Sequence, residues 1–248
     1  MANPGEVNQA IGEAYQCVFV AALEASIRGF EKKFDVRTEP EKTSFKARTG
    51  SEYSFDFSGV YNQRWQHNEV LGECKGYSKG GGLLAEFRSF LAKAYVTSTD
   101  YRRHSRDYFW FVTNVPFGCS EGSGIRNYEF IRATLSDVTR PEIRGILGDS
   151  YVDPSLIGPL ASRIGVFILT DSFLLNTELS YRVEQGENLW MILKRFHAGQ
   201  APSGFGIIAS EIASKNNLRS PDHIVSGKRI RLSWHGIRGA SGGGLGGF

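Results

Sequence analysis

Three ionisable residues, Asp56, Glu73 and Lys75, have the types and the spacing of a hydrolytic site. Two neighbouring carboxylates can share a divalent cation such as Mg²⁺, which prefers oxygen ligands and keeps several waters. One of those waters can attack a phosphodiester, and a nearby lysine can orient it or offset charge that develops on the phosphate. These three groups therefore suit phosphodiester hydrolysis with Mg²⁺ or Mn²⁺ as the cofactor.

The segments that carry these residues read as an antiparallel hairpin. In residues 53–60 aromatic and polar side chains alternate, as in a strand with one apolar face, and residues 69–76 read as the second strand. If the turn is centred at residues 64–65, Asp56 lies directly opposite Glu73, with Cβ atoms roughly 4.5–5.5 Å apart. Two facing carboxylates repel each other, so we expect a positive group between them. The alternative is an ordinary surface ion pair on an edge strand.

Other periodic segments supply the elements that must position this hairpin. Residues 4–28 and 83–96 carry apolar residues at helical spacing, and residues 125–137 read as a further helix. The apolar segment 108–115 predicts a central strand. A polar stretch with Pro40 separates the first helix from the hairpin. The order α, β, β, α, β, α predicts an α/β domain with a mixed sheet flanked by helices.

The combination of Asp56 with Glu73-Cys74-Lys75, between two helices, resembles the PD-(D/E)xK nuclease superfamily over roughly residues 1–140. The resemblance implies a restriction-endonuclease-like core of order α-β-β-β-α-β and a Mg²⁺-dependent endonuclease. Phe55 stands where the motif name has proline, and the helix after Lys75 lacks a clear glutamine and tyrosine signature. These departures concern the subfamily more than the fold.

The resemblance also assigns roles to residues. It implies that Asp56, Glu73 and Lys75 are catalytic and that Asp56 and Glu73 hold the metal ion. In that family an acidic residue of the first helix often completes the metal site, and Glu13 is the candidate here, with Glu24 second.

Basic residues near the cluster indicate a nucleic-acid partner. Arg102 and Arg103, next to Tyr101, could hold phosphates and stack bases, and Lys79 precedes the glycine run 80–82. We expect DNA rather than RNA as the substrate. A merely solvated loop is the alternative for these arginines. The chain has no phosphate-loop consensus, which argues against nucleotide hydrolysis.

A separate pattern begins near residue 180 and predicts strand, helix, helix, strand. It resembles a LysM module, in which the matched positions are Tyr181, Val183, Gly186, Leu189, Ile192, Ile212, Ala213, Asn216, Pro221, Asp222, Ile224, Gly227, Ile230 and Leu232. The resemblance implies a shallow groove for N-acetylglucosamine-containing glycan, lined by Glu187, Asn188, Leu189 and Ile224. Because most matched positions are core or turn residues, they indicate the fold and leave a protein partner open as the ligand.

Composition bounds the remaining choices. The chain has 248 residues, a net charge of +3 and three cysteines, too few and too far apart to predict a disulfide framework. No apolar run approaches the roughly 18–20 residues of a membrane span, and the start lacks a secretory pattern. We therefore expect a bacterial cytoplasmic protein without a membrane partner. Residues 180–248 hold nine Lys and Arg against four acidic residues, which mildly favours a polyanionic partner.

These patterns predict four regions and two candidate functions. The regions are a restriction-endonuclease-like nuclease domain (1–143), a connector with an extra strand (144–178), a LysM module (179–234) and a disordered glycine-rich tail (235–248). The first function is a metal-dependent nuclease for DNA or RNA, with the LysM module for targeting or partner binding. The second is a non-enzymatic peptidoglycan- or partner-binding protein on an inactive nuclease-like scaffold. A homodimer is compatible with both.

Overall fold

The structure, a computed structural model, comprises two compact units. Gly29–Ile168 forms one, and Met1–Arg28 together with Leu169–Phe248 forms the other. We call them the sheet unit and the LysM unit. The structure describes residues 4–63, 66–76, 82–101, 107–117, 124–175, 178–196, 205–221 and 224–233.

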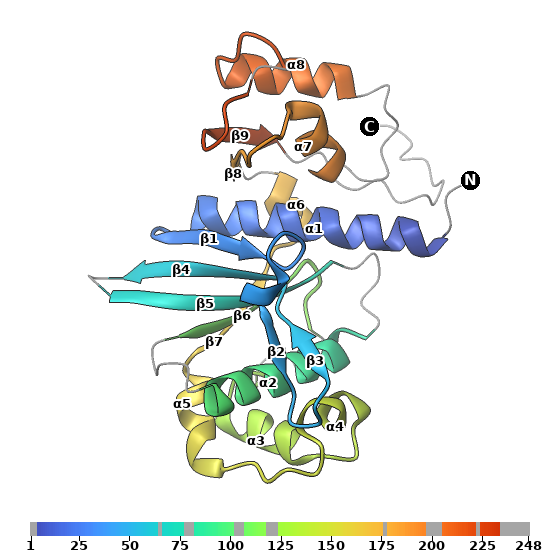
Figure 1. The fold of residues 1–248 in the computed structure, drawn as a ribbon, viewed down its shortest axis with the longest axis vertical. Coiled ribbons are helices and arrows are strands. Elements are labelled where there is room, and N and C mark those ends of the chain that lie inside the picture. The colour runs from blue at the N-terminus through green and yellow to red at the C-terminus, as the bar shows by residue number, and fades with distance from the viewer. Residues whose placement is uncertain are drawn as a thin grey trace. The chain divides into compact units, whose positions relative to one another are not determined.

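A five-stranded mixed sheet of order β1-β4-β5-β6-β7 organises the sheet unit (Figure 1). Its strands are β1 (Phe30–Asp35), β4 (Phe57–Gln63), β5 (Gln66–Lys75), β6 (Tyr108–Thr113) and β7 (Ile164–Ile168). The first three are antiparallel neighbours, whereas β6 runs parallel to β5 and β7 parallel to β6. A small second sheet pairs β2 (Ser44–Lys46) with β3 (Glu52–Ser54). The predicted mixed sheet is confirmed.

Helices cover one face of this sheet (Figure 1). They are α2 (Leu83–Asp100), α3 (Tyr128–Ser136), α4 (Pro141–Leu147) and α5 (Ile157–Ala161). The unit also has two 3₁₀ turns, η1 (Pro40–Lys42) and η2 (Pro154–Leu156). The core under α2 is aromatic, because the Phe87 and Phe90 rings pack at 5.2 and 5.4 Å from the Phe111 ring of β6. These buried contacts fix α2 against the sheet face on which β5 carries Glu73.

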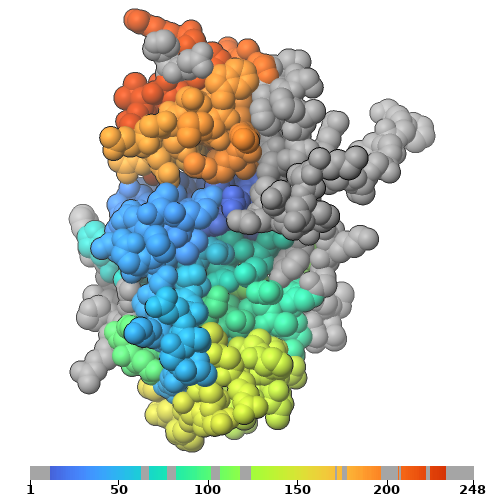
Figure 2. Space-filling model, turned by 45° about the vertical axis from the view of Figure 1, so that its right-hand side comes forward, coloured from blue at the N-terminus to red at the C-terminus, as the bar shows by residue number. Residues whose placement is uncertain are grey.

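The β2-β3 hairpin lies against α4 on the surface of the sheet unit (Figure 2). The Arg48 backbone N–H donates to the Ile146 carbonyl at 3.0 Å, and the Thr49 hydroxyl donates to the Gly145 carbonyl at 2.9 Å. This hairpin ends two residues before Asp56, so its anchoring also steadies the approach to the candidate site.

The LysM unit contains α1 (Pro4–Ser26), α6 (Asp171–Leu175), β8 (Glu178–Arg182), α7 (Leu189–Phe196), α8 (Phe205–Lys215) and β9 (Arg229–Ser233). β8 and β9 are antiparallel, with Tyr181 opposite Ile230. α1 packs against β8 and α7. The strand, helix, helix, strand order agrees with the prediction, but α1 groups with this unit rather than with the sheet, where the sequence placed it.

Three local expectations differ from the structure. The strand predicted over residues 53–60 is broken between β3 and β4, because the Phe55 N–H donates to Thr43 and the Asp56 N–H to Gly72. β1 lies in the polar stretch after the first helix, for which no element was predicted, and it is an edge strand with a bulge near Lys33. The region after residue 141 contains the expected strand, as β7, and also helices that were not expected.

Among the residues with described structure, no helix has the length and apolar character needed to cross a bilayer.

Candidate functional site

The hairpin register brings Asp56 to Glu73. β4 and β5 pair from Phe57 opposite Gly72 to Gln63 opposite Gln66, which is the predicted register. Asp56 lies one residue before β4, and its Oδ2 accepts a hydrogen bond from the Cys74 backbone N–H at 2.7 Å. The Asp56 carboxylate is therefore held at the strand segment that carries both other predicted residues.

Glu73 is the centre of the cluster. It is buried, with 3% of its surface exposed. Its Oε1 lies 2.9 Å from the Lys75 ammonium, and both of its oxygens accept from the Lys93 ammonium at 3.1 Å. The structure thus brings together Asp56, Glu73 and Lys75, and adds a second lysine from α2.

Lys93 was not among the residues proposed from sequence. It occupies a position three residues after Phe90 and four before Thr97, both fully buried, so it interrupts the apolar face of α2. That interruption is the sequence signal that could have found it. A lysine at a core-facing position needs a buried acidic partner, which here is Glu73.

Burial and charge shape the protonation of the cluster. Burial and then the negative charge of Glu73 raise the pKa of Asp56 to about 7, although Lys75, the Cys74 N–H and Lys93 act against this rise. Burial alone would lower the pKa of Lys75, but the charges of Glu73 and Asp56 outweigh it and raise that pKa. Lys75 therefore remains an ammonium at neutral pH beside two acids that repel each other.

The donor set fits a hard divalent cation with few protein ligands. Asp56 and Glu73 offer carboxylate oxygens from adjacent segments, and Mg²⁺ is commonly held by one or two carboxylates plus waters. The described part of the chain contains no group of three or more His, Cys, Asp or Glu side chains arranged for a metal. Glu13 belongs to the LysM unit, so its role as a third ligand stays a prediction.

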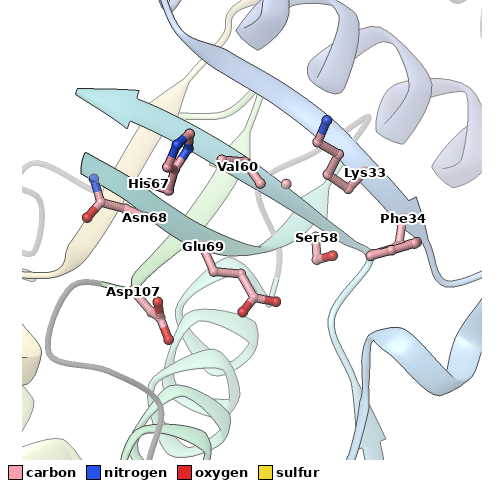
Figure 3. Close-up of a pocket in the computed structure, with 9 residues that line it drawn as sticks. Lys33, Phe34, Ser58, Val60, His67, Asn68, Glu69 and Asp107 are labelled. Carbon is pink, nitrogen blue, oxygen red and sulfur yellow. The ribbon is translucent and has the colours of Figure 1, made fainter. Parts of the chain in front are cut away.

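A separate pocket of about 290 Å³ opens over β1, β4 and β5 (Figure 3). Its lining comprises Lys33, Phe34, Ser58, Gly59, Val60, His67, Asn68, Glu69 and Asp107. Neither Glu73 nor Lys75 lines it. Glu69 precedes Glu73 by four residues on β5, which corresponds to about 13 Å along a strand.

The predicted nucleic-acid contacts Lys79, Arg102 and Arg103 lie outside the residues that the structure describes, as does the glycine-rich tail. Their roles stay predictions.

The predicted glycan-contacting residues have clear structural roles in the LysM unit. The Glu187 carboxylate accepts from the Tyr181 hydroxyl at 2.8 and 2.9 Å and pairs with Arg195 at 2.6 Å. The Asn188 side chain accepts from the Met191 N–H at 2.9 Å and so caps α7. Leu189 is fully buried, whereas Ile224 is partly exposed. Glycan contact at these four positions stays a prediction.

Comparison with known proteins identifies one domain. Residues 181–233 match the LysM domain family, which confirms the predicted module. No curated protein matches the chain.

Solved structures give weak likenesses only. One is the Moraxella osloensis Cap4 SAVED/CARF-domain containing receptor, with 13% identity and a TM-score of 0.32 over 64% of this chain and 33% of that chain. Another is the Acinetobacter baumannii Cap4 receptor with the cyclic trinucleotide 3'3'3'-cAAA, with 16% identity and a TM-score of 0.31 over 65% and 32%. The chain thus spans about a third of the length of these receptors. At such TM-scores the likeness carries no argument about this protein.

Proposed function

We propose that the sheet unit is a metal-dependent nuclease that hydrolyses phosphodiester bonds in DNA or RNA. The observation that carries this proposal is the meeting of Asp56, Glu73 and Lys75. Asp56 is bonded to the Cys74 N–H at 2.7 Å, and Lys75 is 2.9 Å from Glu73. Two acids at one buried place are unfavourable unless cations accompany them, and phosphodiester hydrolysis uses that combination of charges.

The order of elements also supports the proposal. The first helix, α1, groups with the LysM unit. Within the sheet unit, the main-sheet strands β1, β4 and β5 are followed by α2 and β6, which are the last five elements of the order α-β-β-β-α-β. The nuclease resemblance implies this order.

Each residue of the cluster has a role in the proposed reaction. Asp56 and Glu73 would hold Mg²⁺ or Mn²⁺, which when bound polarises the phosphate and activates a water. Lys75 stays charged and has 26% of its side chain exposed, so it can orient the attacking water or offset charge on the phosphate. Cys74 keeps Asp56 on β5 through its backbone N–H and takes no part through its buried thiol.

The nuclease test measures cleavage of DNA and RNA oligonucleotides with Mg²⁺ or Mn²⁺. Glu73→Ala and Lys75→Ala should each abolish cleavage while circular dichroism shows a folded protein. The matched controls Glu52→Ala and Lys46→Ala remove exposed side chains of the same unit and should cleave normally. Unchanged cleavage by both site variants would show that the assignment is wrong.

The confirmed LysM domain supports a second role, binding of peptidoglycan or another N-acetylglucosamine-containing glycan. An inactive scaffold that only carries this module is the competing function, because the two lysines already neutralise Glu73 without a metal ion. Sedimentation with purified cell wall, compared with retardation of nucleic acid over a salt series, separates the two. Phosphate-dominated binding to nucleic acid should weaken steeply with salt.

A further inference from the structure

Lys93 connects the two segments that carry the acids. From α2, its ammonium donates to the Ser54 carbonyl at 3.1 Å and to both oxygens of Glu73 at 3.1 Å. Ser54 ends β3 and lies two residues before Asp56. One ammonium group thus joins the chain leading to Asp56 with the side chain of Glu73.

We propose that Lys93 is a positioning residue that sets the separation and orientation of the Asp56 and Glu73 carboxylates for a divalent cation. This inference rests on the proposed nuclease function. A glutamate side chain has several rotatable bonds, and ordering them on cation binding would weaken the binding. Because Lys93 donates hydrogen bonds to both carboxylate oxygens, the Glu73 side chain is ordered before any cation binds.

The contacts leave Glu73 able to bind a metal while Lys93 stays in place. Among the residues that the structure describes, Oε1 receives both lysines, whereas Oε2 receives Lys93 alone. A carboxylate oxygen has about two acceptor sites. Oε2 is therefore the oxygen that would have an acceptor site left for a cation while its bond to Lys93 is kept.

The two lysines differ in what they can reach. The Lys93 side chain is 15% exposed and uses its donors on Ser54 and Glu73, whereas the Lys75 side chain is 26% exposed and also faces the exposed Glu86 at 3.4 Å. Lys75 is the lysine placed to meet a substrate. Lys93 acts through Glu73.

The test titrates Mn²⁺ alone into the full chain by calorimetry, with Lys93→Met, Lys93→Gln and Lys93→Arg. Outer partners of metal ligands typically contribute 10–100-fold in affinity, so Lys93→Met should weaken Mn²⁺ binding by roughly that factor. Lys93→Arg keeps the positive charge and can donate to both oxygens of Glu73, so it should recover most of the lost Mn²⁺ affinity. Lys33→Met, which breaks the exposed pair with Glu31 at 2.8 Å, is the matched control and should bind as wild type.

Two further measurements distinguish a positioning role of Lys93 from a general contribution to the stability of the fold. Lys93→Met should weaken Mn²⁺ binding less in a Glu73→Gln background than in wild type, because the part of its effect that acts through the Glu73 carboxylate is already lost. Cleavage by Lys93→Met should recover at saturating Mn²⁺, since the loss lies in cation affinity rather than in the chemical step.

The possible results bear on the Lys93 inference and on the proposed nuclease function separately. Lys93→Met that binds Mn²⁺ as tightly as wild type, or more tightly, overturns the inference and leaves the proposed function intact. A wild type that binds no Mn²⁺ overturns both. If Lys93→Met does not fold, the comparison of Lys93→Gln with Lys93→Arg replaces it, and equal affinities for these two overturn the inference.

Discussion

Asp56 is tied to Cys74 by a hydrogen bond of 2.7 Å from the Cys74 backbone N–H to the Asp56 carboxylate. This bond continues the β4-β5 hairpin beyond its last ladder pair, Phe57 opposite Gly72. Because Cys74 lies between Glu73 and Lys75, the bond holds the aspartate at the strand segment that carries both of these residues. The site therefore depends on the close fit of the strands at this end of the hairpin.

A substitution at Gly72 tests whether the site depends on this close fit of β4 and β5. A Cβ at Gly72 would lie 2.0 Å from the Phe57 ring, which is itself fully buried. Gly72→Ala must displace the ring or the strands, so we expect a loss of about 1–3 kcal/mol in the free energy of unfolding and a large loss of cleavage. Gly145→Ala in α4, where a Cβ would meet nothing within 4 Å, is the matched control and should stabilise the protein slightly. Urea unfolding of both variants checks this.

The raised pKa of Asp56 gives a pH dependence of stability. The group titrates near its ordinary value of 3.8 when unfolded and at about 7 when folded, so the folded state binds more protons between these values. Its contribution to stability therefore falls as pH rises through this window. Asp56→Asn cannot titrate and should remove that fall. Urea unfolding of the wild type and of Asp56→Asn at about pH 5 and about pH 7.5 measures this change in stability. An identical change for the two proteins would contradict the raised pKa of Asp56.

Asp35 should give folding stability the opposite pH dependence to that of Asp56. Burial would raise its pKa, but the hydrogen bonds and charge of Arg37 outweigh burial and lower it. Its stabilising contribution is thus present above the unfolded pKa and is lost as pH falls. Arg37→Met should cost about 1–3 kcal/mol in the free energy of unfolding at neutral pH, and less at about pH 3. The exposed Arg126→Met is the control, and a cost for Arg37→Met that does not vary with pH would argue against this account.

In the LysM unit, Glu187 should act on stability. Its side chain, 4% exposed, receives Tyr181, Arg195 and the Glu184 backbone N–H. Glu187→Gln removes the charge that these donors surround, so we expect a loss of about 1–3 kcal/mol in the free energy of unfolding. Thermal unfolding measures it, with the exposed Glu211→Gln as control. A stable Glu187→Gln that has lost glycan binding would instead give this residue a ligand role.

The hairpin could be predicted from sequence because strand residues alternate strictly between two faces. A shift of one residue would turn the apolar side chains of β4 and β5 outward, so alternation and the turn position together determine the register. The same logic placed Glu73 and Lys75 on one face and put Asp56 beside them. The LysM domain could also be predicted from sequence, because its core and turn residues have a fixed spacing.

Other features depend on contacts that local patterns do not encode. β1 has charged side chains at four of its six positions, and only its pairing with β4 makes it a strand. The break at Phe55 and Asp56 results from the hydrogen bonds of their backbone N–H groups to Thr43 and Gly72, which are distant in the sequence. Lys93 lies 20 residues after Glu73, and the packing of α2 on the sheet is what brings the two together.

The central claim is that Asp56 and Glu73 share one divalent cation. Anomalous diffraction from crystals of the full chain soaked in Mn²⁺ tests it most directly. The account predicts a manganese peak within bonding distance of one oxygen from each carboxylate, and its loss in Glu73→Ala crystals soaked in the same way. A peak located elsewhere, or none between these two side chains while the protein still cleaves DNA, would contradict it.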